Sequence, residues 1–106
     1  MEKSYQDQAK VFKALCDSKR LAVLAQLRTG EKCACALQEL LGLPQSGLSY
    51  HMKILCESGI VIGRQAGKWT YYRLSPSGRD QAVELLKELT TPNTEGETNL
   101  TGTDGT

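Results

Sequence analysis

Apolar residues recur at helical spacing through the first half of the chain and predict a series of short helices. The first covers residues 5–15, and Asp17 directly after it can cap the second helix. The apolar face of that second helix consists of Leu21, Val23, Leu24 and Leu27. We expect Gly30 to end it, because glycine readily adopts the left-handed conformation found at helix ends.

The next segment predicts two more short helices, joined by the turn GLPQ at residues 42–45. The third helix is expected to end at Gly42 and the fourth at Gly59. Their apolar positions are Leu37, Leu40 and Leu41 in the third helix and Leu48, Met52 and Leu55 in the fourth. Two short helices separated by so short a turn are typical of a helix-turn-helix unit.

Residues 60–74 change character and predict a β-hairpin. The segments IVIGRQ and WTYYRL are β-branched and aromatic, and AGK between them supplies the glycine that a hairpin turn needs. A further helix then starts at Ser75-Pro76, with serine as its cap and proline in its first turn. The predicted fold class is therefore α+β, mainly α: a winged helix-turn-helix with flanking dimerisation helices, in which the two-stranded hairpin is the wing.

The last helix carries a wide apolar stripe that needs a cover. Its members are Ala82, Val83, Leu85, Leu86 and Leu89. Aromatic residues make up only 6% of the 106 residues, so the core is small and a partner subunit is expected to bury this surface. We therefore expect a homodimer held by the first and last helices. Residues 1–91 are predicted to form one domain, and residues 92–106, rich in Gly, Thr and acidic residues, a disordered tail.

Charge is distributed unevenly along the chain, although the formal net charge is only +1. Residues 45–73 contain four basic residues against one acidic residue, whereas residues 74–106 contain two against six. The middle of the chain is therefore the candidate anion-binding surface. Charges run through the first thirty residues and no run of 18 apolar residues occurs, so we expect a cytoplasmic protein without a membrane partner.

The fourth helix and the hairpin carry the candidate DNA contacts. Outward-facing polar residues on the helix are Gln45, Ser46, Ser49, Tyr50 and Lys53, and the hairpin adds the phosphate-binding candidates Arg64 and Lys68. His51 is also a candidate contact, although we favour a packed, hydrogen-bonded role for it because it adjoins the inward positions. The alternative is a solvated polar face without a ligand. We expect double-stranded operator DNA as the partner.

Four segments resemble the ArsR/SmtB metal-sensing repressors over roughly residues 8–90. They are FKALCDSKRLAVLAQL, GEKCACAL, LPQSGLSYHMKILCESGIV and GRQAGKWTYYRLS, which are similar to the family's helix, metal loop, recognition helix and wing, in that order. The resemblance implies a winged-helix homodimer that represses an operon until a metal or metalloid loosens it from the operator. EKCACAL is similar to the segment ELCVCDL of members that respond to arsenite, cadmium or lead.

The sequence departs from the family's pattern at several positions, and these departures limit which properties of the family the resemblance implies for this chain. Gln38 stands where arsenite sensors of this type have a third cysteine. Pro44 replaces the usual Ser or Asp cap before the recognition helix, and Gly47 replaces a residue with a side chain. The last helix contains no histidine, so zinc sensing by histidines on that helix is excluded.

Cys33 and Cys35 are the candidate metal ligands. Residues two apart lie about 200° around an α-helix, so both thiolates reach one ion only if the first turn of the third helix is unwound. Thiolates without imidazole favour trivalent arsenic or antimony as inducer, with cadmium and lead as competitors, and no permanent cofactor is expected. Cys16 or Cys56 must supply a third sulfur, and we favour Cys16. The alternative is that the pair is an incidental polar edge of a helix.

Three functions compete on this evidence. The leading one is a DNA-binding transcriptional repressor released by arsenite or antimonite. The second is a thiol-redox repressor of the same fold, in which Cys33 and Cys35, or Cys16 and Cys56, form a reversible disulfide. The third, a thiol oxidoreductase, lacks the C-x-x-C motif and its strand-helix-strand context. We therefore do not expect an enzyme.

Overall fold

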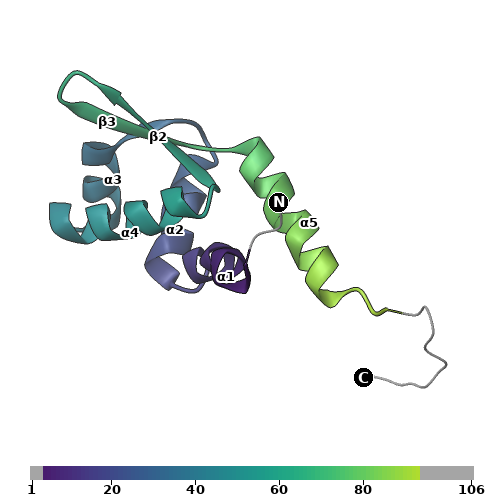
Figure 1. The fold of residues 1–106 in the computed structure, drawn as a ribbon. Helices are drawn as coiled ribbons and strands as arrows, with labels where there is room; N and C mark the ends of the chain where they lie inside the picture. The colour runs from purple at the N-terminus through teal and green to yellow at the C-terminus, as the bar shows by residue number, and fades with distance from the viewer. Residues whose placement is uncertain (1–3, 94–106) are drawn as a thin grey trace.

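The computed structural model describes residues 4–93 and has the predicted order of helices followed by a wing (Figure 1). Its elements are α1 (Tyr5–Ala14), α2 (Ser18–Leu27), β1 (Lys32–Cys33), α3 (Ala34–Leu41), α4 (Gln45–Glu57), β2 (Val61–Ala66), β3 (Trp69–Leu74) and α5 (Pro76–Thr90). The predicted winged helix-turn-helix fold is confirmed. Of the tail predicted at 92–106, all but the first two residues lie outside the described part of the chain.

Side-chain caps start three of the helices where the sequence predicts helix starts. Ser4 Oγ accepts a hydrogen bond from the Asp7 backbone N–H at 3.1 Å, Asp17 caps α2, and Ser75 Oγ accepts from the Gly78 N–H at 3.0 Å. Gly42, with φ of 64°, ends α3 in the left-handed conformation. The prediction for Gly30 is wrong in detail, because α2 already ends at the Arg28 cap and Gly30, with φ of 133°, forms the turn into β1.

The wing belongs to a three-stranded antiparallel sheet with the strand order β1-β3-β2. The prediction of a two-stranded wing is therefore incomplete. In β1, Lys32 pairs with Tyr72 and Cys33 with Tyr71 on β3. A strand of two residues is too short to show alternation of apolar and polar positions, which explains why the sequence pattern did not indicate it.

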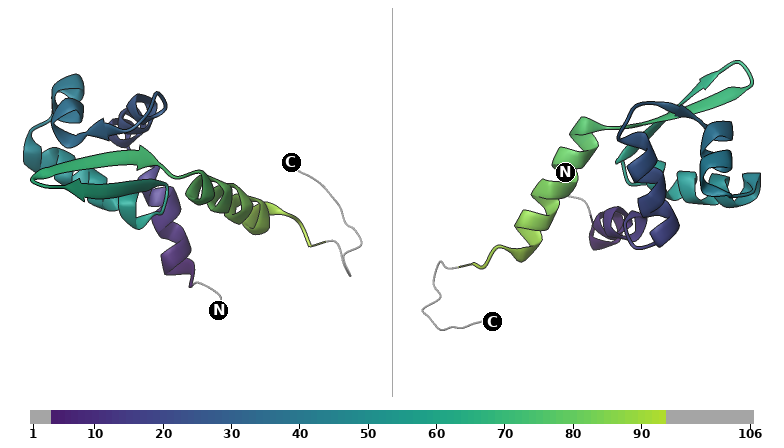
Figure 2. Two further views of the ribbon diagram at one scale, coloured as in Figure 1. Left: turned by 90° about the horizontal axis from the view of Figure 1, so that it is seen from above. Right: turned by 180° about the vertical axis from the view of Figure 1, so that it is seen from behind.

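The core lies between the first four helices and the base of the wing. Its buried residues include Ala14, Val23, Leu27, Leu37, Leu48, Met52, Leu55 and Val61. Helix α5 contributes only Gly78 to the buried set and extends away from the body, as two further views show (Figure 2). Three residues of its predicted stripe are about half exposed: Val83 (48%), Leu86 (52%) and Leu89 (47%). Within residues 4–93, no helix has the length and apolarity that crossing a membrane requires.

Gly78 anchors the start of α5 against the turn between α4 and β2. A Cβ atom at this position would lie 1.8 Å from the carbonyl oxygen of Gly59. Backbone cannot move away as a flexible side chain can, so Gly78→Ala should lower the free energy of unfolding by about 1–3 kcal/mol.

Gly47→Ala is the matched control for that measurement. Its Cβ would make an ordinary contact with the Pro44 side chain at 3.5 Å, inside helix α4. Alanine should raise stability there by about 0.5–1 kcal/mol. Urea denaturation of both variants tests the close approach, and equal stability of the two would contradict it.

Candidate nucleic-acid interface and thiol pair

Helix α4 presents a polar face to solvent. Leu48, Met52 and Leu55 are buried, which fixes the rotation of the helix about its axis. All five polar residues predicted to face outward are exposed: Gln45, Ser46, Ser49, Tyr50 and Lys53. This face combines hydroxyl, amide and ammonium groups that can bond base edges and phosphates.

His51 does not belong to that exposed face. It is 7% exposed, and its Nδ1 lies 3.0 Å from Nη1 of Arg20, which is itself buried at 4% exposure. The packed, hydrogen-bonded role favoured for His51 is confirmed, and its place among the candidate DNA contacts is not supported, because the ring is turned toward the interior. A guanidinium carries only donors, so Nδ1 accepts and the neutral ring carries its proton on Nε2.

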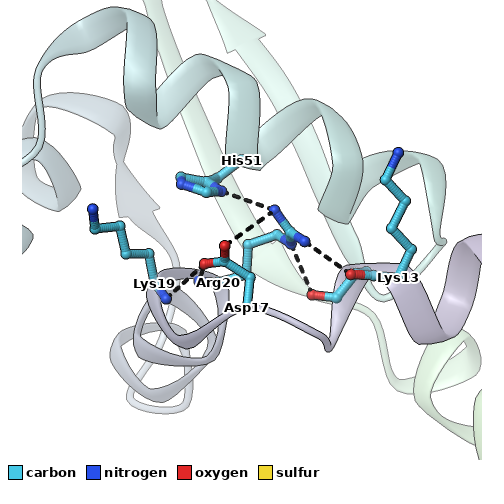
Figure 3. Close-up of polar contacts among 6 residues, drawn as sticks. Lys13, Asp17, Lys19, Arg20 and His51 are labelled. Atoms are coloured by element: carbon cyan, nitrogen blue, oxygen red, sulfur yellow. Dashed lines mark hydrogen bonds and ion pairs between the residues drawn. The ribbon is translucent and has the colours of Figure 1, made fainter.

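Arg20 joins three helices through its guanidinium (Figure 3). Nε donates to the carbonyl oxygen of Ala14 at 3.1 Å and Nη2 to that of Lys13 at 2.9 Å, both at the end of α1. Nη1 reaches His51 on α4, and the Asp17 carboxylate lies 3.9 Å away. Sequence reasoning missed this role, although Arg20 lies one helical turn before Val23 and Leu24 on the apolar face of α2, which was an available signal.

On the wing, the two basic candidates lie in different surroundings. Arg64 donates to both carboxylate oxygens of Glu31, from Nε at 2.9 Å and Nη2 at 2.8 Å, and its guanidinium lies 4.7 Å from the centre of the Tyr71 ring. This pair lowers the pKa of Glu31. Lys68 is exposed at the hairpin tip, with its ammonium 5.4 Å from the Trp69 ring centre. Lys68 is therefore free to meet a phosphate, whereas Arg64 must leave or share Glu31 to do so.

The two thiols of the CxC segment meet without any unwinding of α3. Cys33 has extended backbone angles (φ −70°, ψ 148°) and caps the helix, which begins at Ala34. Its Sγ lies 2.7 Å from Sγ of Cys35 and accepts from the Cys35 backbone N–H at 3.3 Å. The prediction that the two thiols cannot meet within a regular helix agrees with this geometry, because Cys33 is extended and the 200° relation applies only when both residues are helical.

The contact between the two thiols shifts their pKa values in opposite directions. The hydrogen bond from the Cys35 thiol lowers the pKa of Cys33, and the backbone N–H groups of Cys35 and Ala36 add to this effect. The pKa of Cys35 is raised, first because its thiol hydrogen bonds to Cys33. Cys33 therefore loses its proton at a lower pH than Cys35, and the deprotonated thiolate is the metal-binding form of cysteine.

The structure does not bring a third ligand to this pair. Cys16 is exposed after the end of α1, and Cys56 is half-buried in α4, where burial raises the pKa of its thiol. In the described part of the chain, no three His, Cys, Asp or Glu side chains lie close enough to hold one metal ion. Of the predicted ligands, one protomer thus unites Cys33 and Cys35 only.

A helix-turn-helix whose second helix exposes a polar face beside a β-hairpin defines the winged helix-turn-helix class of DNA-binding proteins. Residues 17–62 match the model of the family described as bacterial regulatory protein, arsR family. The arsenical resistance operon repressor of Staphylococcus aureus is 37% identical over 90 residues, which cover 85% of this chain and 86% of that one. The chain therefore belongs to the arsR family of bacterial regulatory proteins.

Two further relatives agree with that assignment. The arsenical resistance operon repressor of Bacillus subtilis (strain 168) is 43% identical over 65 residues, which are 60% of this chain and 62% of that repressor. The solution structure of a homodimeric winged helix-turn-helix DNA-binding domain from Mycobacterium bovis is 28% identical, has a TM-score of 0.64, and is matched over 80% of this chain and 83% of that one.

Replacing Arg20 should be the most destabilising change at this site. Arg20→Ala leaves the buried Ala14 carbonyl oxygen and His51 Nδ1 without a donor and removes one of the two donors of the Lys13 carbonyl oxygen, which should cost about 3 kcal/mol of unfolding free energy. Arg28→Ala, the same substitution at the exposed end of α2, should stay within about 0.5 kcal/mol of the parent protein. Chemical denaturation of both variants measures this, and similar losses would show that the buried contacts do not hold the helices.

Proposed function

We propose that this arsR-family chain is a repressor whose hold on operator DNA is released when trivalent arsenic or antimony binds Cys33 and Cys35. The observation that carries the proposal is the convergence of the two thiols at the N-terminus of α3, with sulfurs 2.7 Å apart. Helix α3 directly precedes α4, and Leu37 of α3 shares the buried core with Leu48 and Met52 of α4. A structural change at the thiols can therefore reach the recognition helix α4 through packed side chains.

The DNA-binding part of the proposal rests on α4 and the wing. The exposed residues Gln45, Ser46, Ser49, Tyr50 and Lys53 enter the major groove, and Arg64 and Lys68 bind phosphates beside it. As a homodimer, the protein binds an imperfect palindrome whose half-sites lie about 34 Å apart or a multiple of it. Such a protein works in the cytoplasm and needs no catalytic group, in keeping with relatives that are named as repressors.

The homodimer is proposed from the uncovered apolar surface. Val83, Leu86 and Leu89 of α5 are about half exposed. The groove between α1 and α5 is lined by apolar side chains, among them Val11 and Leu85, together with polar and charged ones. A second copy that covers α1 and α5 removes this surface from water. The homodimeric state of the Mycobacterium bovis domain supports this assembly.

The inducer is proposed from the chemistry of the donors. The sulfurs of half-buried Cys33 and exposed Cys35, without imidazole beside them, favour trivalent arsenic or antimony, with cadmium and lead as competitors. The third sulfur comes from Cys16, with Cys56 as the other candidate. Since one protomer does not unite either with the pair, the partner subunit or a movement of the chain must supply it.

A redox-sensing repressor is the second candidate, and the short distance between the sulfurs favours it. Cys33 and Cys35 form a disulfide if two electrons and two protons pass to an oxidant such as a peroxide, which is reduced to water. Arsenite added under full reduction separates the two functions, because only the metalloid sensor responds.

Serine variants test the thiol site. Cys33→Ser and Cys35→Ser should each bind operator as the parent protein does but lose release by arsenite, whereas the parent should weaken roughly 5- to 150-fold. Fluorescence anisotropy of labelled duplex measures this with a phosphine reductant, which does not compete for arsenic as dithiols do. Of Cys16→Ser and Cys56→Ser, the true third ligand should lose release and the other should match the parent. Normal release by both CxC variants would disprove the site.

Variants of the wing and of α4 should separate affinity from sequence reading. Lys68→Ala should weaken binding to every duplex and reduce the slope of log affinity against log salt by about one, because one phosphate contact is lost. Ser49→Ala should instead reduce discrimination between operator and mutated operator, by about 1–3 kcal/mol at the base it reads. Loss of discrimination in the Lys68 variant at unchanged general affinity would reverse the assignment.

A further inference from the structure

The candidate sensor thiol and a wing arginine lie in one row across the sheet. Cys33 on β1 is opposite Tyr71 on β3, and Tyr71 is opposite Arg64 on β2. Residues directly opposite each other in antiparallel strands have side chains on the same face. One face of the wing thus runs from the thiol, across the Tyr71 ring, to the Arg64 guanidinium.

An ion pair connects Arg64, at one end of this row, to the segment that carries Cys33. Glu31, two residues before Cys33, receives two hydrogen bonds from Arg64, at 2.9 and 2.8 Å, in the parallel fork that arginine and carboxylate form best. The guanidinium also lies over Tyr71, at 4.7 Å from the ring centre. An exposed ion pair by itself contributes little stability. The bidentate Glu31–Arg64 pair, however, has a fixed orientation because its guanidinium also lies over the Tyr71 ring, and it can therefore transmit movement.

Binding of an ion to both thiols must move the Cys33 side of this arrangement. In the structure the two thiols are in direct contact, and an ion bound by both would replace that contact with two ion–sulfur bonds and so change the position of one sulfur relative to the other. Cys35 is fixed in the first turn of α3, but Cys33 belongs to a strand of two residues. The sulfur that moves is therefore that of Cys33, and its neighbour Glu31 moves with it.

We propose that the Glu31–Arg64 pair is the link through which ion binding at Cys33 and Cys35 shifts the wing. Glu31 is a positioning residue: it holds neither the ion nor DNA, and it couples the strand of the thiol to β2. The inference rests on the proposed function, since it names how that thiol site reaches one of the DNA-binding elements. The proposed link connects the thiols to the wing through the sheet, in addition to their connection to α4 through the packing of α3.

The test compares Glu31→Gln with Glu39→Gln. Glutamine removes the charge and the second acceptor oxygen of the fork. Glu39 is the matched control, because it is an exposed carboxylate on α3 without a hydrogen bond or ion pair to any residue between 4 and 93. Arg64→Lys is a second variant, which keeps the charge but loses the fork. Trp69, the only tryptophan, lies on β3 at the hairpin end and reports the wing by fluorescence.

Sodium arsenite is added to each reduced protein, free and bound to a duplex that the parent selects from a random pool. All variants should bind arsenite with parental affinity by thiolate–arsenic absorbance. In the parent and in Glu39→Gln, arsenite should change Trp69 emission and release the duplex. In Glu31→Gln, the emission change should be lost and the release factor should fall roughly 2- to 30-fold. In Arg64→Lys, which also alters a proposed phosphate contact, the readout is the emission of the free protein, and its change on arsenite addition should be lost.

Two results would overturn the link alone. In the first, Glu31→Gln releases the duplex and changes its Trp69 emission as the parent does. In the second, the parent releases the duplex on arsenite addition but its Trp69 emission does not change. A parent that binds arsenite yet keeps its duplex would instead overturn the proposed function, and the link with it.

Discussion

The arrangement of the helices depends on one buried cation. The guanidinium of Arg20 supplies donors to two carbonyl oxygens at the end of α1 and to His51 on α4, while its own helix is α2. A charge that is only 4% exposed is costly to bury unless its donors are used, and here three of its nitrogens have acceptors within 3.1 Å. The orientation of the recognition helix is therefore set by hydrogen bonds as well as by apolar packing.

With α4 held in this way, the other face of the helix is free for DNA, and the thiol pair lies where it can influence both binding elements. Cys33 caps α3, which packs on α4 through Leu37, and it also pairs in the sheet with Tyr71 of the wing. One residue thus takes part in the helix-turn-helix and in the hairpin. This double membership is the physical basis of the proposal that Cys33 and Cys35 control a surface formed by other residues.

Local features of the sequence predicted the fold well. Asp17 and Ser75 were predicted as caps, and the spacing of Leu48, Met52 and Leu55 assigned the exposed face of α4 correctly, because these signals act within one or two helical turns. The sequence predicted less of the site, since β1 and the Glu31–Arg64 pair depend on partners more than thirty residues away. The sequence also did not show what keeps Cys33 extended, because that is its pairing with Tyr71.

The most direct test of the account is one titration of the reduced parent protein bound to labelled operator. Arsenite is added while thiolate–arsenic absorbance and duplex anisotropy are recorded on the same sample. The account predicts that both signals follow one curve, with release complete when Cys33 and Cys35 are occupied. Saturation of the absorbance while the duplex remains bound would contradict it.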